Sequence, residues 1–149
     1  MSEALVKVEV RGRVGLLTLN RPQVLNALSN EVIDELSAAV RAFEADDNIG
    51  AMVLTGSEKA FAAGADIGEF PVERGGLAAV RRYHERIIAP ALHAIDESPL
   101  PTVALIQGAC VGGGLEIACC CDLRIAGRST RVGAPIARLG FPMAPAELA

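Results

Sequence analysis

The pattern of apolar and polar positions begins with two short strands. Valine alternates with a charged residue from Val6 to Val10, and an apolar run, Val14–Leu19, follows the Arg11–Gly12 turn. Alternation with a period of two is typical of a strand that has one covered face. Residues 6–19 are therefore predicted to form a β-hairpin with one polar face.

The next segment has the spacing of an amphipathic helix. Ser29 can cap its N-terminus, and Glu31 lies in the first turn. Apolar residues then recur three and four positions apart, at Val32, Ile33, Leu36, Ala39, Val40 and Phe43. We expect this apolar stripe to face the core and the helix to end near residues 46–48.

Two mostly apolar runs, Ala51–Thr55 and Thr102–Gln107, are each followed by glycine. Such runs are typical of strands buried on both faces of a parallel sheet. Between them, Ser57–Gly68 is predicted to be a loop of small residues. Leu77–Glu97 is predicted to be a long helix, kinked at Pro90 because an interior proline removes a backbone hydrogen bond.

After Gly108 the sequence predicts a glycine turn, a helix over Leu115–Cys121 and further short strands at Asp122–Ala126 and Arg131–Ala134. Strands that alternate with helices predict an α/β fold with right-handed crossovers. With 149 residues, 51% of them hydrophobic, the chain has enough apolar surface for one core. We therefore expect a single domain over residues 1–149.

Charge and hydropathy exclude several function classes. The formal net charge is −4, and the basic residues are scattered apart from Arg81–Arg82, so a nucleic-acid partner is not expected. The sequence has no uncharged apolar run of about 18 residues and no signal-peptide pattern at Met1–Glu3. These features predict a cytoplasmic protein without a membrane partner.

The cysteines and histidines do not form a metal-binding pattern. Cys119–Cys121 are consecutive, and consecutive helical residues point about 100° apart, so they cannot converge on one zinc ion. With Cys110 in an apolar run, we expect reduced core thiols, no disulfide framework and no metal. His84 and His93 have no acidic or cysteine partner at ligand spacing, which favours surface or capping roles.

Two glycine- and alanine-rich loops are candidates for carrying chemistry. Gly112–Gly114 lie between a strand and a helix, where backbone N–H groups can approach an anion or oxyanion. No P-loop or good G-x-G-x-x-G motif is present, which disfavours nucleotide phosphates; close strand–helix packing is the structural alternative. Phe61–Ile67 could supply a second N–H group to the same oxygen. Glu116 is either an acid–base group or a complement to the helix dipole.

Taken together, these motifs resemble the crotonase (enoyl-CoA hydratase/isomerase) superfamily. The resemblance covers nearly the whole chain, and the motifs occur in the family order. The matching stretches are Asn20–Pro22, Leu25–Leu28, Leu54–Gly56, Phe61–Ile67, Pro99–Pro101, Gln107–Gly108, Gly112–Glu116 and Cys121–Ala126.

The resemblance implies a spiral of ββα units that binds an acyl-CoA thioester of fatty acid metabolism, with CoA as part of the substrate and no separate cofactor. It implies an oxyanion hole formed by the amides of Ala65 and Gly113, and a catalytic role for Glu116 in positioning and activating water. Asp66 is expected to brace its loop. The residues expected along the CoA path are Ala63, Gly64, Asp66, Ile67, Gly68 and Gly112.

The chain departs from the family pattern at one catalytic position. Ile136 stands where the family hydratases carry a second glutamate, and Phe141–Pro145 departs from the usual glycine-rich continuation. The reaction therefore stays open at this point. The alternatives are hydration of a 2-enoyl-CoA, double-bond isomerisation and a non-catalytic acyl-CoA-binding or assembly subunit, with a nucleotide-binding Rossmann domain as a more distant fourth.

The chain is also short relative to the family, whose members are usually well over half as long again. The part without a counterpart here carries the C-terminal helices, which close the pocket and mediate trimers or hexamers in the family. The resemblance thus implies a crotonase-like core that lacks the C-terminal helical part and forms a homo-oligomer.

Overall fold

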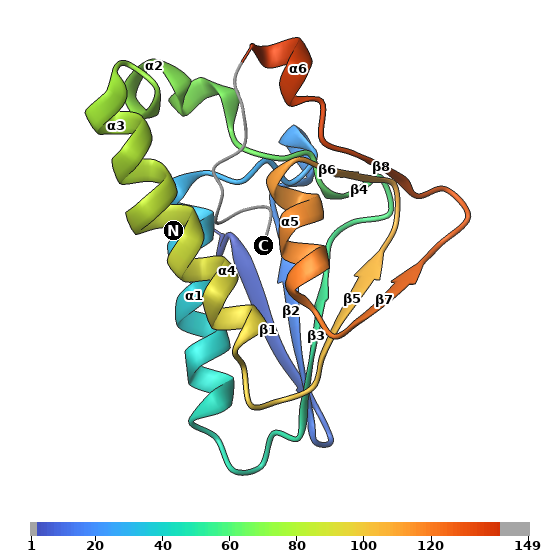
Figure 1. The fold of residues 1–149 in the computed structure, drawn as a ribbon. Helices are drawn as coiled ribbons and strands as arrows, with labels where there is room; N and C mark the ends of the chain where they lie inside the picture. Colours follow the sequence, from blue (N-terminus) through green and yellow to red (C-terminus); the bar gives the residue numbers. More distant parts are fainter. Residues whose placement is uncertain (1–2, 141–149) are drawn as a thin grey trace.

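The computed structural model describes residues 3–140, and Figure 1 shows their fold. The strands are β1 (Val6–Arg11), β2 (Val14–Leu19), β3 (Ala51–Thr55), β4 (Ala60–Ala62), β5 (Thr102–Ile106), β6 (Ala109–Val111), β7 (Leu123–Ala126) and β8 (Arg131–Gly133). The α-helices are α1 (Asn30–Glu44), α2 (Phe70–Glu73), α3 (Leu77–Arg82), α4 (Ala89–Asp96), α5 (Gly113–Cys120) and α6 (Ile136–Leu139). Short 3-10 helices are η1 (Pro22–Val24) and η2 (Ile67–Glu69), and η3 (Tyr83–Ile88) is a π-helix.

The larger sheet has five strands in the order β1-β2-β3-β5-β7. β1 and β2 form the predicted antiparallel hairpin, and the other neighbours pair in parallel. Leu17 is paired with Leu54, and Leu54 with Ala104, so that one buried row crosses three strands. The prediction of a parallel sheet is confirmed.

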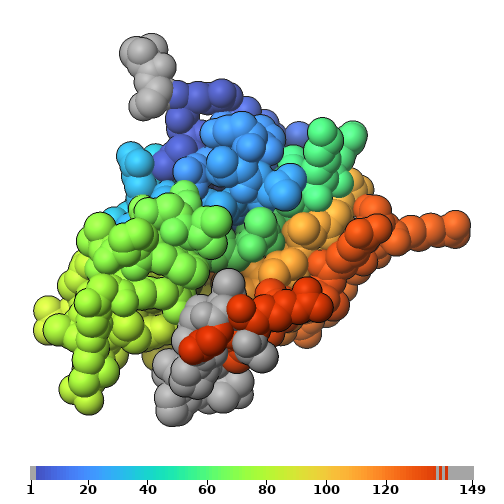
Figure 2. All heavy atoms as spheres, turned by 90° about the horizontal axis from the view of Figure 1, so that it is seen from above, coloured from blue at the N-terminus to red at the C-terminus, as the bar shows by residue number. Residues whose placement is uncertain are grey.

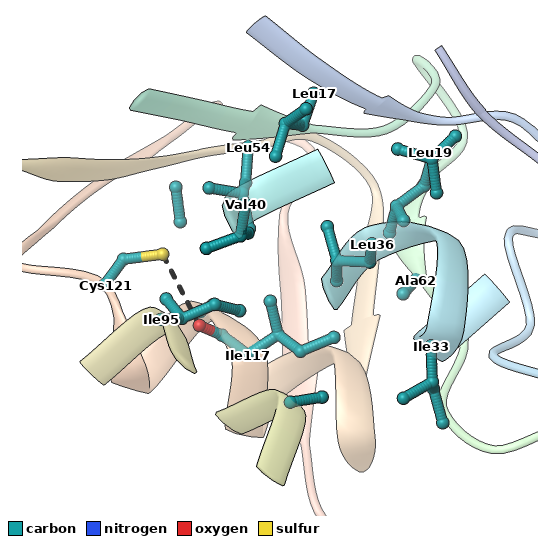
Figure 3. Close-up of a cluster of buried hydrophobic side chains, with 14 of the residues drawn as sticks. Leu17, Leu19, Ile33, Leu36, Val40, Leu54, Ala62, Ile95, Ile117 and Cys121 are labelled. Carbon is teal, nitrogen blue, oxygen red and sulfur yellow. Dashed lines mark hydrogen bonds between the residues drawn. The ribbon is translucent and has the colours of Figure 1, made fainter. Parts of the chain in front are cut away.

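Helices α1, α4 and α5 pack in one layer against the sheet (Figure 1). Figure 3 shows the core between them, where Val40 of α1, Ile95 of α4 and Ile117 of α5 meet the sheet residues. All six members of the predicted apolar stripe on α1 are buried. The Ser29 hydroxyl accepts a hydrogen bond from the Val32 amide at 3.3 Å, which confirms the predicted N-cap.

The hairpin differs from its prediction in the burial of β1. Val6 is buried, but Val8 and Val10 are 53% and 56% exposed, so the expectation of one covered face is wrong beyond the start of the strand. β1 is the edge strand, and α1 is tied to its N-terminal end, where Glu35 accepts hydrogen bonds from the amides of Leu5 and Val6, each at 2.9 Å.

A second, three-stranded parallel sheet was not expected from the pattern. Its order is β4-β6-β8, with Ala60 paired to Ala109 and Cys110 paired to Val132. The predicted loop Ser57–Gly68 therefore contains a strand, and another strand precedes Gly112. Strands of three residues are too short to show a periodicity that a sequence pattern can detect.

The predicted long helix is interrupted, but ahead of its proline. Residues 77–96 run as α3, the π-helical η3 and α4, with Pro90 in the first turn of α4. Pro90 has no N–H to donate, and the change from α-helical to π-helical winding lies just ahead of it. The continuous α-helix expected over Leu77–Glu97 is therefore interrupted near Pro90, and the kink itself stays a prediction.

Two further expectations concern residues 141–145 and membrane-spanning segments. The departure at residues 141–145 lies outside the described residues. In the part of the chain that the structure describes, no helix is both long and apolar enough to cross a membrane.

Candidate active site

The site begins where β4 and β6 end side by side. The loop after β4 passes through Gly64, whose φ of +95° is a conformation that side chains rarely adopt. A Cβ atom at this position would lie 2.9 Å from the Val111 carbonyl oxygen. The other loop meets it at Gly112, which has a φ of +52°. Glycine at position 64 is therefore what allows the two loops to touch.

The N-terminus of α5 is held tightly against β4. A Cβ atom at Gly114 would lie 2.6 Å from the Ala62 carbonyl oxygen, so only glycine permits this approach. The Gly112 amide donates to Gly133 of β8 at 2.9 Å, which fixes the loop ahead of the helix. The first N–H groups of a helix have no partner inside it. The end of α5 thus presents backbone donors beside the Gly64 loop.

Two backbone amides, one from each loop, were predicted to hold an oxyanion. The amides of Ala65 and Gly113 have no hydrogen-bond acceptor among the described residues. Other amides of the two loops are used: the Asp66 amide donates to the Leu28 carbonyl at 3.0 Å, and the Glu116 amide donates to the Gly112 carbonyl at 3.0 Å. Within residues 3–140, the Ala65 and Gly113 N–H groups are therefore not used in hydrogen bonds of the protein backbone.

A cavity with about 110 Å³ accessible to water lies between the two loops. Pro135 and Ile136 line it from the segment after β8, and Ile67 and Phe70 line it from η2 and α2. In Figure 2, seen from above, the segment after β8 is red and η2 and α2 are light green. Its described lining residues are Ala63, Gly64, Ala65, Ile67, Phe70, Arg74, Tyr83, His84, Ile88, Val111, Gly112, Gly113, Glu116, Pro135 and Ile136.

The lining brings together most of the site residues predicted from sequence. Both predicted oxyanion-hole residues and Glu116 are in it, and so are Ala63, Gly64, Ile67 and Gly112. Two predicted substrate-binding residues, Asp66 and Gly68, do not belong to this lining. Their roles in substrate binding, like the roles of the others, stay predictions.

Asp66 is instead part of the loop's internal hydrogen bonding. Its carboxylate accepts from the Gly68 amide at 2.9 Å, which caps η2, and forms an ion pair with the Arg21 guanidinium at 2.9 Å. The Gly68 hydrogen bond, with a smaller effect from Arg21, lowers the pKa of the Asp66 carboxyl below its ordinary value. This geometry agrees with the bracing role expected for Asp66.

Asn26 fixes the start of the same loop from beneath. It is only 2% exposed, and its side-chain amide donates to the carbonyls of Ala60 and Phe61 at 2.9 and 3.2 Å. Its side-chain oxygen accepts from the Arg21 amide at 2.8 Å. The first two matching motifs therefore act structurally, by locking β4 and the Asp66 loop in place.

The two positions expected to carry catalytic glutamates differ in polarity. Glu116, half-buried in the first turn of α5, is the one acidic residue among the described lining residues. Ile136, at the start of α6, also lines the cavity, so the position of the second family glutamate presents an apolar side chain. The described lining thus contains one carboxylate.

Sequence reasoning missed three polar lining residues: Arg74, Tyr83 and His84. The guanidinium of Arg74 lies 4.2 Å from the centre of the Phe70 ring, and the rings of Tyr83 and His84 meet edge to face at 5.3 Å. The expectation of a surface or capping role is wrong for His84, which is half-buried and lines the cavity, whereas His93 is exposed. No spacing signal could identify these residues, because the fold of residues 70–88 places them.

The cysteines are not part of the described lining. Cys110 and Cys121 are buried, as expected, and burial raises the pKa of their thiols to about 11 and about 12. Cys120 is half-buried, but Cys119 is exposed, which corrects the expectation of core thiols throughout. Within residues 3–140, no group of three or more potential metal-binding side chains is found.

Comparison with known proteins agrees with the fold and the motifs. Residues 9–147 match the family model described as enoyl-CoA hydratase/isomerase. The chain is 46% identical over 140 residues to a probable enoyl-CoA hydratase of Rhizobium meliloti, covering 94% of this chain and 52% of that protein. It is 41% identical over 135 residues to the mitochondrial enoyl-CoA hydratase of Pongo abelii, covering 89% and 45%.

Solved structures show the same fold. An enoyl-CoA hydratase/carnithine racemase from Magnetospirillum magneticum superposes with a TM-score of 0.94 at 38% identity, over 99% of this chain and 55% of that one. The enoyl-CoA hydratase of Bacillus anthracis gives 0.86 at 31% identity, over 93% and 53%. The chain spans about half the length of these relatives. Its fold is crotonase-like, and the chain belongs to the enoyl-CoA hydratase/isomerase family.

Proposed function

We propose that this chain forms the acyl-CoA-binding core of an enzyme that reversibly hydrates a 2-enoyl-CoA thioester. The observation that carries the proposal is the pairing of two available backbone donors, the amides of Ala65 and Gly113, with Glu116 in one cavity. The names of the relatives support the same substrate class. CoA is part of the substrate, and the absence of a separate cofactor or metal stays a prediction.

The two loop amides suit a thioester carbonyl. When water adds to the β-carbon of an enoyl thioester, negative charge develops on the carbonyl oxygen. Two fixed N–H groups stabilise that charge without having to reorient, and the loss of one such donor typically costs about 3 kcal/mol of transition-state stabilisation. The N-terminus of α5 adds the positive end of its helix dipole.

Glu116 is the group proposed to act on the water that is added. In the proposed step its carboxylate accepts a proton from the water while the oxygen bonds to the β-carbon, and the electrons of the double bond move towards the thioester carbonyl. The α-carbon must then receive a proton. A positioned carboxylate contributes typically about 10²–10⁴-fold to such a step.

The test is the loss of the enoyl-thioester absorbance of crotonyl-CoA, compared between the protein and its Glu116→Gln variant. We expect hydration by the parent and a fall in kcat of at least about 100-fold in the variant, because glutamine cannot accept the proton. Glu31→Gln is the matched control, since Glu31 also lies in a first helical turn but is exposed on α1. It should leave the rate unchanged.

Equal hydration by the parent and by Glu116→Gln would overturn the role of Glu116. Binding of acyl-CoA without turnover by either protein would favour a non-catalytic acyl-CoA-binding or assembly subunit. The Rossmann alternative has lost its support, because the strand order and the crotonase-like fold differ from a dinucleotide-binding sheet.

Double-bond isomerisation is the second candidate, and Ile136 favours it. With Glu116 as the one carboxylate in the described lining, a single group can remove a proton from one carbon and return it to another. This reaction adds no water. Incubation of a 3-enoyl-CoA should then produce the conjugated 2-enoyl-CoA absorbance, without formation of a hydroxyacyl-CoA.

We further propose, from the family resemblance, that the protein acts in the cytoplasm as a homo-oligomer, a trimer or hexamer. Size-exclusion chromatography with light scattering would measure the oligomeric state directly.

A further inference from the structure

The cavity contains a second group that can transfer a proton. His84 is half-buried, belongs to η3 and lines the same cavity as Glu116, which reaches it from α5. Imidazole can both give and take a proton near neutral pH, which a carboxylate in its ordinary range does less well. A histidine and a glutamate thus share one cavity but come from different elements.

The position of His84 depends on an unusual backbone turn. Residues 83–88 form a π-helix, and single π-helical turns within α-helices occur frequently at functional sites. The buried ring of Tyr83 holds the imidazole edge to face, with the ring centroids 5.3 Å apart and an interplanar angle of 85°. This packing restricts the orientation of the imidazole ring.

The chemistry of the cavity leaves a task for such a group. Glu116 accounts for the proton taken from water, but the α-carbon must be protonated, and Ile136 has no proton to give. We propose that His84 is the second proton-transfer group of this site, in place of a carboxylate at position 136. The inference rests on the proposed function.

The step balances with these two residues alone. The water oxygen bonds to the β-carbon and its proton passes to the Glu116 carboxylate, while the imidazolium of His84 gives a proton to the α-carbon. The double bond becomes a single bond and no electrons are lost or gained. Exchange with solvent returns a proton to His84 and removes one from Glu116 before the next turnover.

The first test compares crotonyl-CoA hydration by the parent, His84→Gln and the matched control His93→Gln, whose histidine is exposed on α4. We expect His84→Gln to lower kcat about 100-fold with little change in KM, and His93→Gln to leave both unchanged. If His84→Gln keeps the parent kcat while Glu116→Gln loses activity, the inference about His84 is overturned but the proposed function is not.

The pH profile separates proton transfer from a structural role. The other charged or titratable groups in the described lining are Glu116 of α5, Arg74 after α2 and Tyr83 on the same element. The parent kcat should fall as pH rises, because the proposed step needs a proton on the imidazole, and His84→Gln should lack this fall. A lower kcat with an unchanged profile would make His84 structural and overturn the proposal.

A second measurement does not need turnover. Butyryl-CoA, which has no double bond to hydrate, is added while the imidazole signals are followed by NMR. The His84 signals, assigned by their loss in His84→Gln, should shift, and those of His93 should not. Unmoved His84 signals with bound butyryl-CoA would overturn the inference alone, whereas no binding of butyryl-CoA would overturn the proposed function as well.

Discussion

Asp66 shows how one residue supports the site without lining it. Its carboxylate accepts a hydrogen bond from the Gly68 amide and forms an ion pair with Arg21. The side chains of Asp66 and Arg21 are mostly shielded from solvent, with 22% and 19% of their surface exposed. These interactions favour the charged carboxylate, so the pKa of Asp66 in the folded protein lies below its unfolded value. Folding stability is therefore linked to the ionisation of Asp66.

The sign of this linkage gives a prediction for Asp66→Asn. The stabilisation is present above the unfolded pKa of about 3.9 and is lost as pH falls through the lower, folded pKa. Asparagine keeps an acceptor for the Gly68 amide but loses the charge. The variant should lose on the order of 1 kcal/mol of unfolding free energy at pH 7, with a difference that shrinks below pH 4. Urea unfolding at both pH values measures this, and a constant difference would contradict it.

At the scale of elements, the site depends on the contact between the β4 loop and the α5 loop. Gly64 has a positive φ and no room for a Cβ atom, because the Val111 carbonyl would lie 2.9 Å away. Gly12, in the β1–β2 turn, also has a positive φ, of +63°, but nothing lies within 4 Å of its Cβ position. A comparison of substitutions at these two glycines therefore separates the free-energy cost of the backbone conformation from the cost of the steric clash.

Both Gly64→Ala and Gly12→Ala should be destabilising, each by about 1–2 kcal/mol for the left-handed conformation. Gly64→Ala should lose about 1–3 kcal/mol more, since the neighbour is backbone and cannot turn away. It should also weaken butyryl-CoA binding, which Gly12→Ala should not. Urea unfolding and calorimetric titration of the two variants measure these effects. Equal losses of stability would show that the loops have room to separate.

The sequence was most informative where an element has its own period or cap. The apolar stripe of α1 and its Ser29 cap follow from local spacing, and the structure confirms both. β4 and β6 depend on pairing between strands about 50 residues apart, which local spacing does not contain. The same limit applies to His84, because it lies in the π-helical turn η3, whose place beside the cavity follows from the fold.

At the scale of the whole molecule, the two loops at the ends of β4 and β6 were predicted from the family motifs, and the structure places them around one cavity. The face of the larger sheet opposite the helices carries exposed apolar residues, among them Leu105, Leu123 and Ile125. Apolar surface of this kind is typical of contact with another surface. The homo-oligomer that could cover this apolar face stays a prediction, and so does the single domain over residues 1–149.

The central claim is that a thioester carbonyl binds between the amides of Ala65 and Gly113. Backbone N–H groups cannot be removed by a side-chain substitution, so the direct measurement is their NMR signals during titration with butyryl-CoA. Titration with CoA, which has no thioester carbonyl, is the control. We expect both amide protons to move downfield with butyryl-CoA but not with CoA. Bound butyryl-CoA with both signals unmoved would contradict it.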